Sequence, residues 1–237
     1  MKVVFISGWG SDEKVWFPIT TNIDMDFIHI SWWECLGYSL NDNALLKFLS
    51  DIEKPVIVIG WSLGGMIAMH ASITFPTKVL GMVIISSTPR MLSDKDYKGV
   101  NKRVLKAMKA KLSFNSLELL KDFATMSDSP SCNKLSQKNF TDSAETIDID
   151  KLYKGLEFLE KTDMRDNLSD VKIPISILVG DNDKIIEPSN SIYLKNSIDK
   201  ASLRTISDEG HFLIFHKPKL IADSIKQLIS KVENLKL

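Results

Sequence analysis

The stretch Val56-Ile57-Val58-Ile59-Gly60-Trp61-Ser62-Leu63-Gly64 decides the fold of this 237-residue chain. Its four β-branched residues predict a strand buried on both faces, and the pentapeptide that follows has the pattern G-x-S-x-G. In this context the serine occupies a sharp turn between strand and helix, with its hydroxyl exposed above the sheet. Glycines two residues before and after Ser62 let the strand and the helix approach each other without Cβ clashes. The sequence therefore predicts a strand–turn–helix unit with Ser62 as a candidate nucleophile.

Short apolar segments alternate with helical ones on both sides of this unit. Strands are predicted for residues 2–7, 27–32, 56–61, 80–86, 175–180 and 202–206, and helices for residues 43–52, 63–75, 190–198 and 219–232. Strand segments that are apolar throughout favour a parallel sheet covered by helices on both faces. With right-handed crossovers, the chain is predicted to form an α/β fold with the strand order 2-1-3-4-5-6.

The alternation breaks once, between Thr88 and Lys172. This stretch has no strand-like run, predicts several helices and contains the loop signal Ser127-Asp128-Ser129-Pro130-Ser131. We therefore interpret residues 89–172 as a helical cap inserted over the carboxyl edge of the sheet, where the loops of such a fold converge. Residues 1–88 and 173–237 are predicted to form the core domain.

A nucleophilic serine needs a base, and the chain has four candidates: His29, His70, His211 and His216. His29 lies in an apolar strand segment and His70 lies well inside the helix after the serine, so both are interpreted as ordinary packed or half-exposed side chains. His211 lies in a loop between a late strand and the last helix, and is the preferred base. His216 is interpreted as the beginning of that last helix and is the rival candidate.

The acid that orients the base is expected between serine and histidine in the chain. The strand at 175–180 is followed by two aspartates, of which Asp183 fits the pattern G-x-x-D-x-x-x-x-P and is preferred. Asp181 comes very soon after the strand, where it is interpreted as a turn former, and it stays the reserve candidate. Asp208 is only three residues from His211, which is too close to reach the far nitrogen of the ring.

Backbone amides that stabilise a developing oxyanion are predicted at two places. Leu63 follows the nucleophile at the beginning of a helix, and Trp9 lies in the loop Ser7-Gly8-Trp9-Gly10 after the first strand. A glycine-rich loop could instead bind phosphate, but G-x-G-x-x-G and a Walker lysine are both absent from it, so this interpretation is weaker. Trp9, Leu63 and Trp61 are also expected to line the substrate site.

Composition sets further limits on the function. The chain has 30 basic and 30 acidic residues, so no net charge attracts nucleic acid or membrane. Its two cysteines, Cys35 and Cys132, suggest neither a disulfide framework nor a metal site. Without a signal-peptide pattern at the first residues or an apolar span of about 20 residues, we expect a soluble, cytoplasmic and monomeric protein. The serine chemistry implies no metal and no other cofactor.

Basic residues are concentrated in the first part of the predicted cap. Nine basic and three acidic residues lie between positions 90 and 121, and four of the basic ones share a predicted helix: Lys102, Arg103, Lys106 and Lys109. Such a run is a solvated helix face in many proteins, and equally it can be a docking surface for an acidic partner. Both interpretations stay open.

These motifs resemble those of the α/β-hydrolase superfamily, and more narrowly of the BioH family of pimeloyl-[acyl-carrier protein] methyl ester esterases. The resemblance spans nearly the whole chain and is carried by these segments: Gly8-Trp9-Gly10, Val15-Trp16, Gly60 to Gly65, Ser86 to Arg90, Gly155-Leu156 and Thr162 to Arg165. It implies a triad of Ser62, Asp183 and His211. It also implies oxyanion amides at Trp9 and Leu63, and a substrate carried on an acidic acyl-carrier protein.

The chain departs from the family pattern in two ways. Ser7 stands where the family usually has histidine, which is expected to loosen the loop below the oxyanion amides. The antiparallel hairpin that the family usually has at one edge of the sheet is missing. Other activities of this fold are alternatives: a generic short-chain carboxylesterase, a lyase of the menaquinone pathway, a cofactor-free haloperoxidase, a carbon–carbon bond hydrolase, or a small-molecule receptor.

Overall fold

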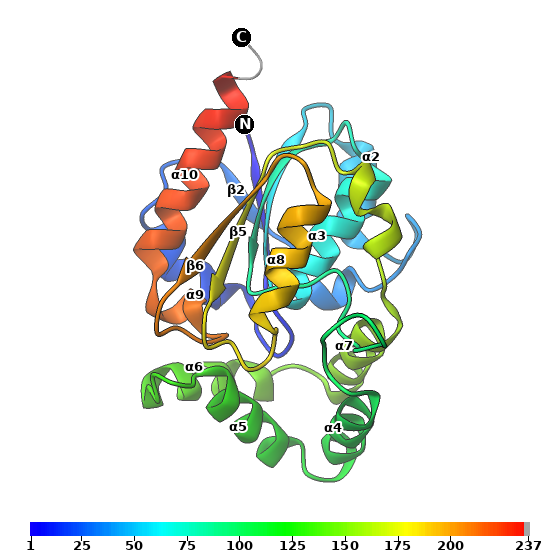
Figure 1. Ribbon diagram of the computed structural model, residues 1–237, viewed down its shortest axis with the longest axis vertical. Coiled ribbons are helices and arrows are strands. Elements are labelled where there is room, and N and C mark those ends of the chain that lie inside the picture. The colour runs from blue at the N-terminus through cyan, green and yellow to red at the C-terminus, as the bar shows by residue number, and fades with distance from the viewer. Residues whose placement is uncertain (235–237) are drawn as a thin grey trace.

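The computed structural model describes residues 1–234, and a six-stranded sheet forms its centre (Figure 1). Its strands are β1 (Val3–Ile6), β2 (Phe27–His29), β3 (Val56–Trp61), β4 (Val79–Ile85), β5 (Ile175–Gly180) and β6 (Ala201–Ile206). All neighbouring strands are parallel, in the order β2-β1-β3-β4-β5-β6. The predicted parallel sheet and its strand order are confirmed.

Burial along the strands explains this arrangement. Every residue of β1 and β3 is buried, as expected for central strands with a helix layer on each side. At the opposite edge from β2, β6 has several exposed residues. Strand β2 is shorter than predicted because the chain turns into a 3-10 helix at Trp32–Glu34. The Trp32 indole is fully buried there and donates to the Ser11 carbonyl at 3.0 Å.

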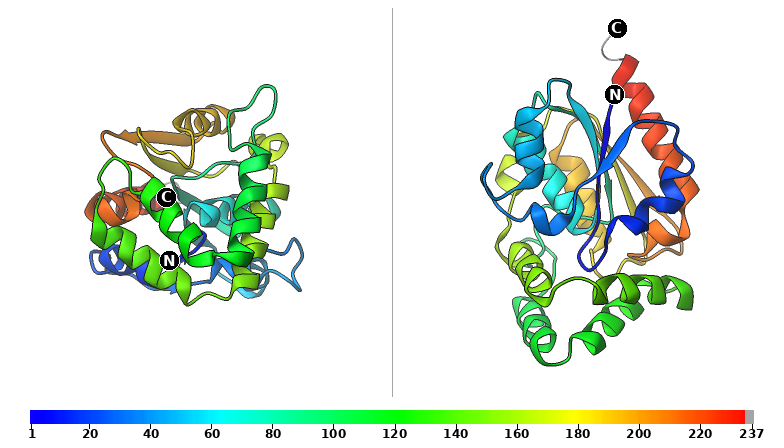
Figure 2. Two further views of the ribbon diagram at one scale, coloured as in Figure 1. Left: turned by 90° about the horizontal axis from the view of Figure 1, so that it is seen from below. Right: turned by 180° about the vertical axis from the view of Figure 1, so that it is seen from behind.

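Helices cover both faces of the sheet (Figures 1 and 2). One face carries α2 (Ala44–Asp51), α3 (Leu63–Thr74) and α8 (Pro188–Ser197), and the other carries α1 (Phe17–Thr20) and α10 (Pro218–Asn234). The short helix α9 (Leu213–His216) precedes α10. Within residues 1–234, none of the helices is long and apolar enough to cross a membrane.

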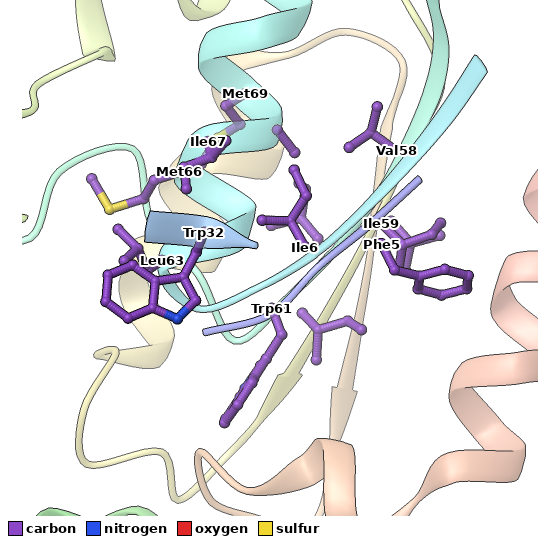
Figure 3. Close-up of a cluster of buried hydrophobic side chains, with 14 of the residues drawn as sticks. Phe5, Ile6, Trp32, Val58, Ile59, Trp61, Leu63, Met66, Ile67 and Met69 are labelled. Atoms are coloured by element: carbon purple, nitrogen blue, oxygen red, sulfur yellow. The ribbon is translucent and has the colours of Figure 1, made fainter. Parts of the chain in front are cut away.

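Helix α3 is the most deeply buried of these helices. Nine of its 12 residues are buried, and Met66, Ile67 and Met69 pack in the apolar cluster with β1 and β3 (Figure 3). A helix that is apolar on all sides has its free-energy minimum inside the protein, because each buried side chain contributes about 1.5–3 kcal/mol. The position of Ser62, directly before this helix, is therefore fixed by the core.

Four helices lie between β4 and β5 in the chain, and we call them the cap helices: α4 (Lys102–Phe114), α5 (Ser116–Ser127), α6 (Lys134–Glu145) and α7 (Ile149–Lys161). All four lie at one end of the sheet (Figures 1 and 2). The side chain of an asparagine or aspartate accepts from a first-turn amide in each, at Asn101, Asn115, Asn133 and Asp148. The helical content expected of this stretch is present; its division from the core as a separate domain stays a prediction.

The chain leaves for the cap helices and returns from them at adjacent points. Arg90 and Asp163 form an isolated antiparallel bridge, and the Met164 amide donates to the Pro89 carbonyl at 3.1 Å. The Asp163 carboxylate pairs with both Arg90 and Arg165. Although partial burial raises the pKa of Asp163, hydrogen bonds from these guanidinium groups lower it to about 2. This junction is therefore held by backbone and side-chain contacts together.

Candidate active site

Ser62 lies between β3 and α3 in a backbone conformation that L-residues rarely adopt, with φ 55° and ψ −120°. Its neighbours hold this strained turn in place. The Ser62 amide donates to the Ile85 carbonyl at 2.9 Å, and its carbonyl accepts from the Ser87 hydroxyl at 2.6 Å and from the Gly65 amide at 2.9 Å. The role of Ser87 could not be deduced from the sequence, because serine has no distinctive pattern there.

The glycines of the motif stand where no side chain fits. A Cβ on Gly64 would overlap the carbonyl oxygens of Ile6 and Ser7, and a Cβ on Gly60 would overlap the backbone of Gly64. Both clashes are with backbone atoms, which cannot rotate away. The close approach of strand and helix inferred from the sequence is thus present.

The structure brings Ser62, His211 and Asp183 together. His211 Nε2 lies 2.9 Å from Ser62 Oγ, and His211 Nδ1 lies 2.9 Å from Asp183 Oδ2. The other carboxylate oxygen, Asp183 Oδ1, accepts from the amides of Ile185 and Ile186, both at 2.8 Å. His211 is 1% exposed and Asp183 is 5% exposed. These contacts give the geometry of a serine nucleophile, a base and an orienting acid.

The rival acids occupy other positions. Asp181 Oδ1 accepts from the Asp208 amide at 2.8 Å, which makes Asp181 part of a turn as expected. Asp208 is exposed, has φ 59° and forms no hydrogen bond with His211 among the described residues.

The rival bases also lie elsewhere. His70 packs edge-on against Tyr38, and burial lowers its pKa. His29 packs against Phe5, and burial lowers its pKa although Glu13 opposes the shift. His216 ends α9, two residues before α10 begins at Pro218, as expected of the entrance to the last helix, and it contacts Asp128 and Glu209.

The two amides predicted for the oxyanion have no backbone acceptor. Within residues 1–234, neither the Trp9 amide nor the Leu63 amide donates to a backbone carbonyl. The loop of Trp9 lies against Ser62, since a Cβ on Gly8 would be 3.0 Å from Ser62 Cβ. The Trp9 indole donates to the Leu152 carbonyl in α7 at 2.8 Å, and Ser7 Oγ donates to the Ser11 carbonyl at 2.9 Å. Ser7 therefore forms a hydrogen bond within this loop, and the expected loosening stays a prediction.

A cavity of about 300 Å³ opens beside Ser62. Trp9 and Leu63 line it as predicted, and four methionines line it as well: Met66, Met91, Met108 and Met126. Its rim includes Val104 and Met126, which are 49% and 42% exposed. The cavity therefore connects Ser62, which is partly exposed, with the surface between α4 and α5.

Trp61 was predicted to line the substrate site, but it is not among the described residues that line this cavity. Its indole is 1% exposed and packs against Phe212 and Phe215, and its Nε1 donates to the His211 carbonyl at 3.2 Å. The side chain lies behind the His211 loop because β3 ends there. Trp61 supports the base instead of lining the cavity.

The basic residues predicted for docking differ in their surroundings. Arg103 and Lys106 are exposed and form no ion pair with the described residues, and Lys102 lies 3.7 Å from Glu160. Lys109 is half-buried and pairs with Glu160, which raises the pKa of the lysine. The charge of Lys109 is therefore balanced by Glu160 within the protein, whereas the side chains of Lys102, Arg103 and Lys106 are exposed to solvent.

Among residues 1–234, no group of three or more His, Cys, Asp or Glu side chains could hold a metal ion. The two cysteines are free: burial raises the pKa of Cys35 to about 12, and Cys132 is exposed.

Comparison with known proteins identifies the fold family. Residues 38–218 match the Abhydrolase_1 family, described as the alpha/beta hydrolase fold. The chain belongs to this family of α/β hydrolases.

Curated relatives of the chain share one name. A pimeloyl-[acyl-carrier protein] methyl ester esterase of Pseudoalteromonas atlantica is 28% identical over 86% of this chain and 84% of its own. The esterase of that name from Wigglesworthia glossinidia brevipalpis is 28% identical over 98% of this chain and 94% of its own.

Solved structures agree on the fold. A hydrolase from Oleispira antarctica superposes with a TM-score of 0.84 at 20% identity over 98% of this chain and 91% of its own. A bromoperoxidase from Bacillus anthracis gives a TM-score of 0.85 at 18% identity over 97% of this chain and 91% of its own.

Proposed function

We propose that this protein is a serine carboxylic ester hydrolase. The hydrogen-bonded chain Ser62–His211–Asp183, at the buried end of an apolar cavity, is the observation that carries this proposal. A serine is a weak nucleophile by itself, and a buried imidazole at 2.9 Å can take its proton as it attacks a carbonyl.

Each group then has one role. His211 Nε2 accepts the proton of the Ser62 hydroxyl while Oγ bonds to the carbonyl carbon, and Asp183 stabilises the imidazolium. The amides of Trp9 and Leu63 hold the oxyanion, each donor being worth about 3 kcal/mol in comparable sites. His211 then protonates the leaving alcohol. A water, deprotonated by His211, then attacks the carbonyl carbon of the acyl-serine. The bond to Ser62 Oγ breaks, His211 returns the proton to Oγ, and the acid is released.

The proposed substrate is pimeloyl-[acyl-carrier protein] methyl ester, which would yield the pimeloyl carrier protein and methanol in biotin synthesis. The shared name of the curated relatives supports it. An apolar cavity of about 300 Å³ suits an aliphatic chain. The exposed basic side chains of α4 beside its rim suit an acidic carrier.

The decisive experiment uses Ser62→Ala with two substrates. The variant should lose turnover of a p-nitrophenyl acyl ester and of pimeloyl-carrier methyl ester, while its circular dichroism stays that of the wild type. Substantial turnover by the folded variant would contradict the serine mechanism. Turnover of the small ester alone by wild type would contradict the proposed substrate, as would failure to restore growth without biotin in a strain lacking the esterase.

A generic short-chain carboxylesterase is the second candidate. The four methionines of the cavity favour it, because flexible thioether side chains adapt to ligands of different shape. Comparable kcat/KM for acetyl, butyryl and C7 esters, with no preference for the carrier-bound form, would favour this candidate over the specific one.

A further inference from the structure

A buried polar cluster joins the cap helices to the loop that carries His211. His216 lies between two carboxylates, with Nδ1 2.9 Å from Glu209 Oε2 and Nε2 2.9 Å from Asp128 Oδ1. The contact with Glu209 is a hydrogen bond, whereas the contact with Asp128 has the distance of an ion pair without hydrogen-bond alignment. The side chains of Asp128, Glu209 and His216 are 0%, 6% and 9% exposed. We call these three residues the clamp.

Two further side chains contact the carboxylates of the clamp. Gln137 of α6 donates to Asp128 Oδ2 at 2.8 Å, and the Lys217 ammonium lies 2.9 Å from Glu209 Oε1. Each carboxylate of the clamp is therefore held by a second side chain as well as by its contact with His216.

Backbone contacts join the same two segments. The Phe212 amide donates to the Ser127 carbonyl at 3.0 Å, and a Cβ on Gly210 would overlap the Ser129 carbonyl oxygen. The end of α5 therefore lies directly on the residues that flank His211.

Helix α5 also touches the reacting groups. Phe123, one turn before its end, packs edge-on against the His211 ring with centroids 6.3 Å apart, and against the Trp9 ring at 5.2 Å. Asp128 directly follows α5 and is its C-cap residue. Any movement of this end therefore reaches both the base and the oxyanion loop.

We propose that the clamp fixes the end of α5 against the His211 loop, so that His216 and Asp128 are positioning residues for the reaction at Ser62. This inference rests on the proposed ester hydrolysis. Without the clamp, α5 and the loop can separate, and His211 Nε2 moves away from Ser62 Oγ. A misplacement of about 1 Å is enough to cost roughly 100-fold in rate.

The test compares two clamp variants, His216→Gln and Asp128→Asn, with a matched control. Asp122→Asn makes the same chemical change on the same helix, but at a surface ion pair with Lys111 where the aspartate is 64% exposed. With a p-nitrophenyl ester, kcat should fall roughly 10- to 100-fold in the clamp variants, with KM nearly unchanged, and should stay at the wild-type value in the control. The kcat of the double variant should be little lower than that of the less active single variant, because both changes disrupt the same cluster and their effects do not add.

A spectroscopic measurement separates positioning from stability. The proton between His211 Nδ1 and Asp183 should give a downfield NMR signal that shifts or broadens in the clamp variants and not in Asp122→Asn. If His216→Gln does not fold, the isosteric Asp128→Asn carries the test. Folded clamp variants with wild-type kcat and an unchanged signal would overturn the clamp. A wild-type enzyme without Ser62-dependent turnover would instead overturn the proposed function, and the NMR signal would still test the clamp.

Discussion

The imidazole of His211 lies 2.9 Å from the hydroxyl of Ser62, although 149 residues separate them in the chain. Ser62 follows β3 and His211 follows β6, and parallel strands bring their carboxyl ends to one edge of the sheet. The Trp61 indole, which donates to the His211 carbonyl at 3.2 Å, ties the two loops together across that edge. The sheet and this buried side chain therefore both hold His211 near Ser62.

The identity of the acid can be settled with three amide variants. Asp183→Asn should reduce kcat for a small ester by roughly 10⁴-fold, because the amide no longer stabilises the charged imidazole. Asp181→Asn and Asp208→Asn, which change exposed turn residues, should retain kcat within a few-fold. Steady-state assays at saturating ester measure kcat for the three variants. A larger loss of kcat in Asp181→Asn or Asp208→Asn than in Asp183→Asn would contradict the assignment of the acid to Asp183.

The oxyanion loop is tested by adding one methyl group. In Gly8→Ala the new Cβ would meet the Trp61 ring at 2.9 Å and Ser62 Cβ at 3.0 Å, so the loop must shift. The Trp9 amide would then be misaligned, and kcat should fall by roughly 100-fold, as when one donor is removed. Thermal unfolding checks that the protein is folded; a folded variant with unchanged kcat would argue against the Trp9 amide as a donor.

If α4 docks the carrier protein, reversing its basic charges should affect the carrier-bound ester and not a small ester. Reversal of Lys102, Arg103 and Lys106 to glutamate should raise KM for the carrier-bound ester and leave turnover of a p-nitrophenyl ester nearly unchanged. Added salt should weaken the wild-type preference for the carrier-bound ester, because exposed charges are screened. As a contrast, Lys109→Glu removes the pair with Glu160 and should lower stability. Equal effects on both substrates, or none, would refute docking.

The junction at Asp163 predicts a pH-dependent stability. Because the pKa of this carboxyl falls from 3.8 to about 2 on folding, its contribution is fully present above pH 4 and is lost as pH falls through 2. Asp163→Asn should therefore lower the free energy of unfolding at pH 7 by at most about 2 kcal/mol, since solvent screens a partly exposed pair. Urea titrations between pH 7 and pH 3 should show this difference beginning to shrink at the acid end; a difference independent of pH would contradict it.

Thiol chemistry distinguishes the two cysteines. At pH 8 a disulfide reagent should label one thiol of the native protein, Cys132, because Cys35 is buried and its pKa is raised to about 12. Cys132→Ser should remove the fast phase, and denaturant should expose the second thiol. Rapid labelling of Cys35 in the native state would show that this part of the core opens readily.

The sequence predicted those features that depend on local pattern. The run Val56–Ile59 and the glycines around Ser62 are local signals, and they are enough to place strand, turn and helix. The sequence could not reveal that Ser87 supports the Ser62 carbonyl, that Trp61 faces away from the cavity, or that Lys109 meets Glu160. These contacts join side chains that are distant in the chain, and tertiary packing decides whether they meet.

The bridge between Arg90 and Asp163 also has a consequence for how this protein can diverge. The chain leaves the sheet after β4 and returns to it before β5 at two adjacent points. The segment between Arg90 and Asp163 therefore contributes no strand to the sheet. This segment can therefore change in length or sequence while Ser62 stays after β3 and Asp183 stays after β5. In a chimera, a segment from another hydrolase would replace the residues between Arg90 and Asp163. We expect such a chimera to change substrate selectivity and keep Ser62 and Asp183 in place, if the new segment makes its own contacts with the His211 loop.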